Sequence, residues 1–177
     1  MLGATVFNAN RSLVCRTMAP RWIFVAASTG AEAFHLLVTL PVLLFLMFLC
    51  GRNMALSGVW CLLAGFISLL LMGYGFALMI GIANACFRDL ERIVQLLLMV
   101  WFYVTPVFYG IGQVPEKYHW LLKLNCMYYP VELFRSAFYA PANCFLSCIL
   151  SLCCGVVTAA AGTLVYRWQQ KKLAEVI

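Results

Sequence analysis

The longest stretch of the sequence without Asp, Glu, Lys or Arg includes all residues from Met54 to Phe87. A helix needs about 20 predominantly apolar residues to cross the hydrocarbon core of a bilayer. The stretch exceeds that length, so it predicts a membrane helix that is tilted, bent or extended beyond the lipid. Two further uncharged stretches, 33–51 and 141–166, are also long enough to approach or complete a crossing.

The composition excludes a water-soluble globular domain. Charged residues make up 10% of the chain and hydrophobic residues 65%, with a mean hydropathy of +0.95. Soluble domains carry about 25% charged residues. No basic patch with interleaved aromatic residues indicates a nucleic-acid partner. The cysteines fall mostly within or at the ends of apolar stretches, Cys61 among them. We interpret them as small hydrophobic residues, and we expect neither a disulfide framework nor a metal site.

These patterns predict an all-α membrane protein with four transmembrane helices and a re-entrant helical hairpin between the third and fourth spans. All of it forms one transmembrane domain, 1–177. A short cytosolic segment at 8–20, which Pro20 should end, precedes the spans. The expected segments that follow are spans at 22–50, 55–87 and 93–110, a re-entrant gate segment at 113–140 and a span at 142–166.

Small residues at helical spacing predict where helices approach closely. In the second span they form a ridge of Gly73, Ala77, Gly81 and Ala85, and in the last span Gly155, Ala159 and Gly162 recur. Small side chains let helix backbones come together in a membrane. We therefore expect both faces to be helix contacts, and the ridge could also be a contact between subunits.

The gate segment is too polar to cross a bilayer and too apolar for an ordinary loop. Its uncharged part between Lys123 and Glu132 is far shorter than a span, and Pro115 and Pro130 interrupt the chain. Backbone of this kind enters a bilayer only where it rests on protein or lines a water-filled cavity. We therefore predict two short helices that dip into one leaflet.

The basic residues indicate the orientation. With four spans, both termini lie on one side, and the side richer in Lys and Arg is cytoplasmic. We expect both termini in the cytoplasm, with the protein in the inner (plasma) membrane. That side carries Arg11, Arg16, Arg21, Arg88, Arg92, Arg167, Lys171 and Lys172, against Arg52, Lys117, Lys123 and Arg135 on the other.

Motifs of soluble enzymes are absent from the sequence. It has no GxxxxGK(S/T) phosphate loop and no GxSxG, HExxH or CxxC motif. We therefore assign no catalytic residue and expect a protein without ATPase motifs of its own. A membrane-embedded enzyme acting on lipid-linked sugars is the alternative from another class. It would need Glu32, His35 and a third polar residue in one cavity.

Several short motifs, in their order and spacing, resemble the membrane subunit of a type-2 ATP-binding-cassette (ABC-2) exporter. The similarity runs from about Asn8 to the end and is greatest to the branch that exports O-antigen, capsular polysaccharide or teichoic acid. Two departures stand out: Cys126 follows Asn125 where the family usually has Pro, and family members usually have six spans behind an amphipathic N-terminal helix. The matching motifs are Phe87-Arg88-Asp89-Leu90, Thr105-Pro106-Val107, Val114-Pro115, Leu124-Asn125 and Phe134-Arg135.

The resemblance implies a permease subunit that forms a homodimer and docks a nucleotide-binding ATPase subunit. The substrate would be a lipid-linked polysaccharide, with a drug or another lipid as the alternative, and an inactive truncated remnant as a further one. ATP and Mg would bind the partner subunit, so this chain would hold no cofactor. The residues that would contact the ATPase subunit are Asn10, Arg11, Arg16, Arg88, Asp89 and Arg92.

Aromatic residues crowd the outer third of the protein, where they form either an interfacial belt or a surface on which sugar rings stack. We expect Trp101, Thr105 and Phe108 to share one helix face and to line the translocation path with Tyr109. The expected gate residues are Pro115, Trp120, Asn125, Tyr128, Tyr129 and Arg135.

Two ionisable residues fall within the first span. Glu32 and His35 lie three residues apart, which we place near the start of that span. Ionisable residues inside a membrane are functional candidates by default. A plain hydrogen-bonded structural role is the alternative.

Overall fold

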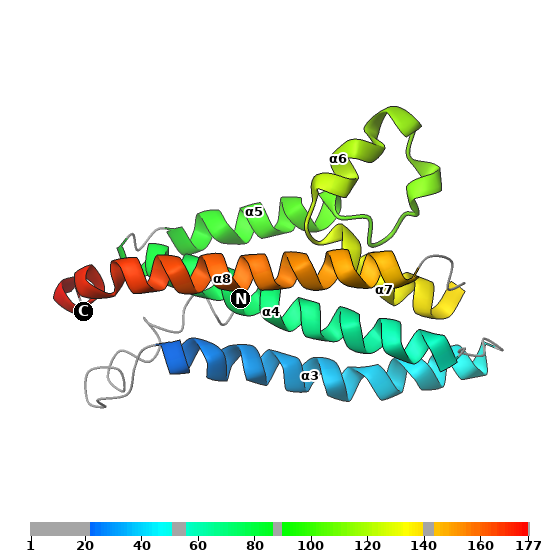
Figure 1. The fold of residues 1–177 in the computed structure, drawn as a ribbon, viewed down its shortest axis with the longest axis horizontal. Helices are drawn as coiled ribbons and strands as arrows, with labels where there is room; N and C mark the ends of the chain where they lie inside the picture. The colour runs from blue at the N-terminus through cyan, green and yellow to red at the C-terminus, as the bar shows by residue number, and fades with distance from the viewer. Residues whose placement is uncertain (1–21, 51–55, 87–89, 140–143, 177) are drawn as a thin grey trace.

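The computed structural model describes residues 22–50, 56–86, 90–139 and 144–176 (Figure 1). Within these ranges the chain is helical and contains no strand, as the all-α prediction requires. The elements are α3 (Trp22–Leu49), α4 (Leu56–Cys86), α5 (Leu90–Val104), η1 (Ile111–Gln113), η2 (Glu116–Tyr118), α6 (His119–Leu124), α7 (Tyr128–Tyr139) and α8 (Cys144–Val176).

Three of the described helices are long and apolar enough to cross a membrane: Trp22–Leu49, Gly58–Asn84 and Phe145–Gln169. In Figure 1 the long helices run side by side along the long axis of the molecule. The start of α3, the start of α5 and the end of α8 lie at one end of this bundle, and α6 projects from its side near the other end.

The third expected span is shorter than the sequence indicated. Helix α5 has 15 residues and ends at Val104, whereas we expected helix to residue 110. At 1.5 Å per residue it is about 22 Å long, against about 30 Å of hydrocarbon. Pro106 explains the end, because proline lacks a backbone N–H and disfavours helix at the residue before it. The last helical bond runs from the Thr105 N–H to the Trp101 carbonyl, at 2.9 Å.

Helix α4 is the centre of the bundle, and its closest neighbour is α8. A Cβ atom added to Gly162 of α8 would lie 2.5 Å from the carbonyl oxygen of Gly75. One added to Gly155 would lie 3.0 Å from the carbonyl oxygen of Ser68. The two backbones therefore touch along this crossing, as small residues permit in membrane helices. Helix α3 packs on another side of α4, where Thr29 lies against Gly73.

Two buried serines join α4 to α8 at the same crossing. The Ser151 hydroxyl donates to the Ser68 hydroxyl oxygen at 2.7 Å, and the Ser68 hydroxyl donates to the Gly65 carbonyl at 2.9 Å. Both side chains are fully buried. The pair thus supplies a hydrogen bond between helices where water cannot compete.

Replacing Ser151 with Ala is expected to lower the free energy of unfolding by about 0.6 kcal/mol, the average for a hydrogen bond between membrane helices. The loss is small because Ser68 keeps its bond to Gly65. Thr163→Ala is the matched control, since that hydroxyl bonds only within its own helix, to Ala160. Unfolding in mixed micelles measures both variants, and equal losses would contradict a specific contribution from the serine pair.

Helix α7 lies against the first half of α4. Leu133 and Ala137 of α7 are buried with Cys61 and Leu62 of α4, and the Phe134 ring lies 3.1 Å from the Cβ position of Gly65. This contact fixes α7 alongside the bundle.

Cys61 corrects our interpretation of the cysteines, because it is bonded in a disulfide. The cysteines at 50, 126, 148, 153 and 154 are free thiols. The small-hydrophobe interpretation was therefore wrong for Cys61, whose position inside an apolar stretch gave no sign of a bond.

Candidate functional site

The end of α5 is bonded to the turn that precedes α7 through one asparagine. Trp101 donates its indole N–H to Asn125 Oδ1 at 2.9 Å, and Asn125 Nδ2 donates to Thr105 Oγ1 at 2.9 Å. The Thr105 hydroxyl in turn donates to the Trp101 carbonyl at 2.9 Å. Thr105 is 5% exposed, and Trp101 and Asn125 are partly buried. We call these three residues, together with Arg135 of α7, the clasp.

Asn125 suits its position because it also shapes the backbone. It follows the last residue of α6 in extended conformation, with φ −72° and ψ 117°. Its Oδ1 accepts a second bond from the Met127 N–H at 3.1 Å, and its carbonyl accepts from the Tyr128 N–H at 3.0 Å. Side chains of Asn commonly bond to the backbone two residues on in turns. Asn125 thus lies between the end of α6 and the start of α7, and its side-chain amide bonds to the end of α5.

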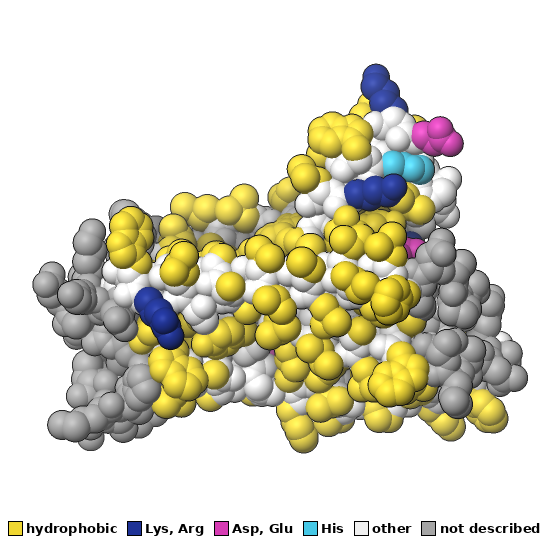
Figure 2. Space-filling view, in the orientation of Figure 1, with side chains coloured by type: hydrophobic (Ala, Val, Ile, Leu, Met, Phe, Trp, Pro, Cys, Tyr) yellow, Lys and Arg dark blue, Asp and Glu magenta, His cyan; other side chains and the backbone are white. Residues whose placement is uncertain are grey.

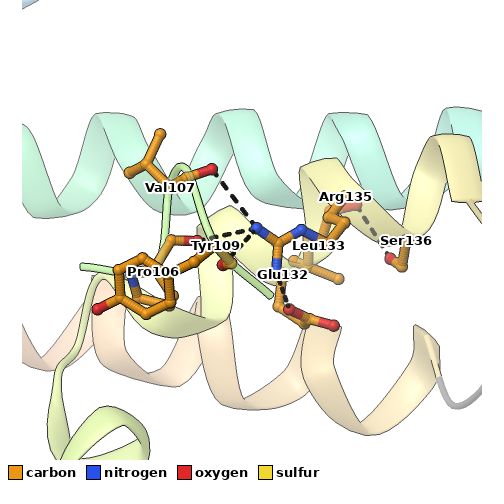
Figure 3. A network of polar contacts seen from close by, with 7 residues as sticks. All are labelled: Pro106, Val107, Tyr109, Glu132, Leu133, Arg135 and Ser136. Carbon is orange, nitrogen blue, oxygen red and sulfur yellow. Dashed lines mark hydrogen bonds and ion pairs between the residues drawn. The ribbon is translucent and has the colours of Figure 1, made fainter. Parts of the chain in front are cut away.

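Arg135 of α7 forms the second half of the clasp (Figure 3). Its Nη2 donates to the carbonyl of Pro106 at 2.9 Å and to that of Tyr109 at 3.0 Å. Glu132 Oε2 lies 3.6 Å from Nη1. Both carbonyls belong to the turn that follows α5, and a charged donor makes the stronger kind of hydrogen bond. Arg135 therefore holds the turn after α5 against α7.

A cavity of about 450 Å³ opens beside the clasp, between α3 and α5 and over α4. Trp101 of α5 and Thr105 just after it line the cavity, as do Met127 and Val131 from the turn before α7 and from α7. The size is in the range of ligand pockets. Its remaining lining is Ser28, Thr29, Glu32, Leu69, Gly73, Phe76, Ala77, Ile80, Leu98, Phe102 and Val107.

The expected helix face of Trp101, Thr105 and Phe108 does not form. Phe108 lies beyond the end of α5, is 77% exposed and packs its ring at 5.4 Å from that of Phe102. The prediction assumed helix through residue 110, and Pro106 prevents it. Tyr109 contacts the end of α5 instead, with its hydroxyl 3.2 Å from the Val104 carbonyl.

The other expected gate residues fall into two groups. Pro115 and Trp120 are exposed on the projecting part of the segment. Tyr128 and Tyr129 pack edge to face at the start of α7, with ring centroids 5.3 Å apart. Burial raises the pKa of the Tyr128 phenol, and the nearby Glu132 carboxylate raises it further.

The projecting part is the polar part of this face of the molecule. In Figure 2 acidic, basic and histidine side chains gather on it, while hydrophobic side chains dominate the surface of the long helices. His119 closes its loop through a 2.8 Å contact between Nε2 and the Val114 carbonyl. We did not predict this role of His119 from the sequence.

Most of the expected contacts with an ATPase subunit lie outside the described residues: Asn10, Arg11, Arg16, Arg88 and Asp89. Arg92 is described and lies exposed in the first turns of α5. Among the described residues, no group of three His, Cys, Asp or Glu side chains could hold a metal ion.

Glu32 lies within α3, whose bounds agree closely with the predicted span at 22–50. It is about 15 Å along the helix axis from Trp22, the first described residue of α3. It lines the cavity, and His35 does not.

Comparison with known proteins now identifies the family. Residues 5–139 match the family model of the ABC-2 type transporter, and the chain therefore belongs to this family of membrane transport proteins. Two O-antigen export system permease proteins RfbA of Klebsiella pneumoniae are 27% and 26% identical over 171 residues, or 97% of this chain. RfbA of Myxococcus xanthus is 25% identical over 142 residues, 77% of this chain.

The relatives are longer than this chain. It spans 66% of the length of the two Klebsiella proteins and 53% of the Myxococcus protein. The family resemblance in the sequence motifs is thus confirmed, over about two thirds of the Klebsiella proteins.

Proposed function

We propose that this chain acts as the permease subunit of an ATP-driven exporter that moves a lipid-linked polysaccharide across the inner membrane. Membership in the ABC-2 type transporter family and similarity to O-antigen export permeases support the transport role and the substrate class. A partner subunit would supply ATP hydrolysis, with ATP and Mg bound there.

The clasp is the observation that carries the proposal. It ties the segment between α5 and α7 to the end of α5, and α7 then packs beside α4. The chain thereby makes a polar, aromatic detour at one end of the bundle and returns through α8 (Figure 1). Such backbone is tolerated at membrane depth only on protein or beside water, which fits a gate at the mouth of a passage.

The proposed topology has four passes, α3, α4, α5 and α8, with 113–140 as the re-entrant gate. The start of α3 and the end of α8 lie at the same end of the bundle. The excess of Lys and Arg would make that end, and with it both termini, cytoplasmic. Arg92 is at that end too, where an ATPase subunit would dock. A homodimer would place two such bundles around the substrate.

Fewer observations support the alternative functions. A drug or lipid substrate would use the same family architecture, and the clasp does not discriminate among them. An enzyme acting on lipid-linked sugars would need Glu32 and His35 in one cavity, and only Glu32 lines the described one. An inactive remnant predicts no transport at all.

Expression in cells that lack their own O-antigen permease tests the proposal. We expect the chain to co-purify with the nucleotide-binding subunit and to restore O-antigen at the cell surface. Arg92→Glu should reduce the co-purified ATPase several-fold, because reversing a charge at an interface rim opposes association. Lys117→Glu is the matched control, as Lys117 is equally exposed but lies on the projecting segment.

The substrate and the permease role are contradicted by different results. Co-purification with drug extrusion but without surface O-antigen would contradict the glycan substrate. Absence of co-purification would contradict the permease role itself.

A further inference from the structure

Helices α4 and α8 run in the same direction and touch at a regular interval (Figure 1). The hydroxyls of Ser68 and Ser151 bond at 2.7 Å across 83 positions of the chain. Two turns further along, a Cβ atom added to Gly75 would overlap the carbonyl oxygen of Thr158, and these two residues have the same offset of 83. Seven residues make about two helical turns, so the same faces meet again at each step. The register of the crossing can therefore be followed toward the start of both helices.

Two turns before the serine pair, this register reaches two cysteines. Cys61 lies in α4, and Cys144 is the first residue of α8. They are separated by the same 83 positions as the serines. Cys148, one turn further along α8, packs against the buried cluster that contains Cys61. The first turns of α8 thus lie beside Cys61.

Cys61 is bonded in a disulfide, and its partner is a cysteine that is not a free thiol. The cysteines at 50, 126, 148, 153 and 154 are free thiols, which leaves positions 15, 86 and 144. Cys86 ends the same helix as Cys61, about 37 Å along its axis, whereas the two Cα atoms of a disulfide lie about 4–7 Å apart. Position 86 is therefore too far away.

Cys15 is also out of reach of Cys61. It precedes Trp22 by seven residues, which span at most about 25 Å. Helix α3 begins at Trp22, at the end of the bundle opposite the start of α4, and its 28 residues are about 42 Å long. The chain before α3 is too short to cover most of that length, so position 144 is the candidate that remains.

We infer that the disulfide of Cys61 joins it to Cys144 and staples the start of α8 to the start of α4. Leu133 and Ala137 of α7 are buried in the same cluster as Cys61, so the bond lies at the seat of α7. It would hold α4 and α8 at a fixed separation there, and the last part of the proposed gate would rest on one covalently closed unit. The pairing follows from the helix register, whereas the side of the membrane on which it lies rests on the proposed function and its topology.

The proposed location suits the chemistry of a disulfide. The candidate spans begin at Gly58 in α4 and at Phe145 in α8, so both cysteine positions lie within about 5 Å of the end of a span. In the proposed topology this end faces the extracytoplasmic side, and disulfides form and persist in such oxidising compartments.

A dithiol–disulfide oxidoreductase of that compartment would be the oxidant. One cysteine thiolate attacks the disulfide of the oxidant, and the other thiolate then displaces the oxidant from the mixed disulfide. The two cysteines lose two electrons and two protons, and the oxidant takes up both and leaves as a dithiol.

Cleavage after lysine separates the two cysteines and tests the pairing. The chain contains lysine at 117, 123, 171 and 172, so complete digestion leaves Cys61 in fragment 1–117 and Cys144 in fragment 124–171. The full chain is purified from membranes with its free thiols blocked by N-ethylmaleimide, and it is then denatured and digested. We expect the two fragments to migrate as one species without reductant and as two species after reduction.

Alanine substitutions identify the partner. Cys61→Ala and Cys144→Ala should each abolish the joined species. Cys148→Ala is the matched control, because Cys148 packs against the same cluster but is a free thiol, and its fragments should stay joined. Fragmentation of the linked wild-type peptides by mass spectrometry locates the bond even if a variant does not fold.

Two results would overturn the pairing. Wild-type fragments that separate without reductant would show that no disulfide joins the two helices in the membrane. Fragments that stay joined in Cys144→Ala would assign another cysteine as the partner of Cys61.

The dependence on the oxidant tests the location of the bond. In cells that lack the extracytoplasmic oxidoreductase, the joined fraction should fall several-fold and recover when cystine is added to the medium. An unchanged joined fraction would contradict the extracytoplasmic location. Co-purification of the ATPase subunit is read from the same membranes: its loss with the fragments still joined contradicts the permease role and leaves the disulfide standing.

Discussion

Gly75→Leu is expected to prevent α4 from packing against α8 and to leave little folded protein. A Cβ atom at Gly75 would overlap the carbonyl oxygen of Thr158 and lie 2.8 Å from the backbone nitrogen of Ala159. Those atoms belong to the backbone of a continuous helix and cannot turn aside. Overpacking costs about 1–3 kcal/mol even where side chains can shift, so we expect a loss of about 3 kcal/mol or more.

The measurement is the fraction of folded protein in mixed micelles, with Gly30→Leu as the matched control. Gly30 lies in α3, and a Cβ atom there would meet nothing within 4 Å. Leucine is also a better helix former than glycine. The control should therefore match or exceed the wild-type stability. If both variants were equally stable, α4 and α8 would not cross at Gly75 in the membrane.

The α4–α8 crossing shows how far sequence patterns reach. The spacing of Gly155 and Gly162 indicated a close contact on the last span, and both glycines lie at the crossing. The small-residue ridge of the second span was predicted to begin at Gly73, which faces Thr29 of α3, whereas Gly75 faces α8. Spacing identifies a face suited to close packing, but which helix covers it depends on the whole bundle.

The clasp marks a different limit. The sequence singled out Trp101, Thr105, Asn125 and Arg135, but it placed the first two in a path and the others in a gate. The structure joins Asn125 to Trp101 and Thr105 across 24 and 20 positions of the chain, and it joins Arg135 to the carbonyl of Pro106 across 29. Local patterns carry no information on such distant pairing. The end of α5 was predictable, because Pro106 was visible and its effect on the preceding turn is local.

Asn125→Leu is expected to open the clasp and to reduce the proposed glycan export about tenfold, while α4 and α8 remain packed. Leucine has a similar shape but cannot bond, so the Trp101 indole N–H loses its acceptor and the Thr105 hydroxyl loses its donor. Each buried group left unpaired costs about 1–3 kcal/mol. The Thr105 hydroxyl keeps its own bond to the Trp101 carbonyl, so the indole N–H is the group left unpaired, and its loss shifts the balance between the closed and open arrangements by about tenfold.

Cys126 reports on the clasp without any assay of export. Burial raises the pKa of its thiol above the ordinary value, so little reactive thiolate is present near neutral pH. When the clasp opens, the thiol is hydrated and its pKa falls toward the ordinary value. The rate of alkylation by iodoacetamide in Asn125→Leu should therefore rise at lower pH than in the wild type, as mass spectrometry of the Cys126 peptide would show.

The matched control is Gln113→Leu, which removes an exposed amide from the same segment, where no side-chain bond is lost among the described residues. It should leave both the Cys126 profile and export unchanged. The alkylation of Cys126 reports whether the segment stays bonded to α5, whereas the export assay reports whether transport continues. Faster alkylation of Cys126 with full export would mean that the clasp has a structural role alone. An unchanged Cys126 profile would mean that Asn125 does not hold the segment to α5. Faster alkylation of Cys126 together with reduced export, in Asn125→Leu and not in the control, would make the position of this segment a condition for export.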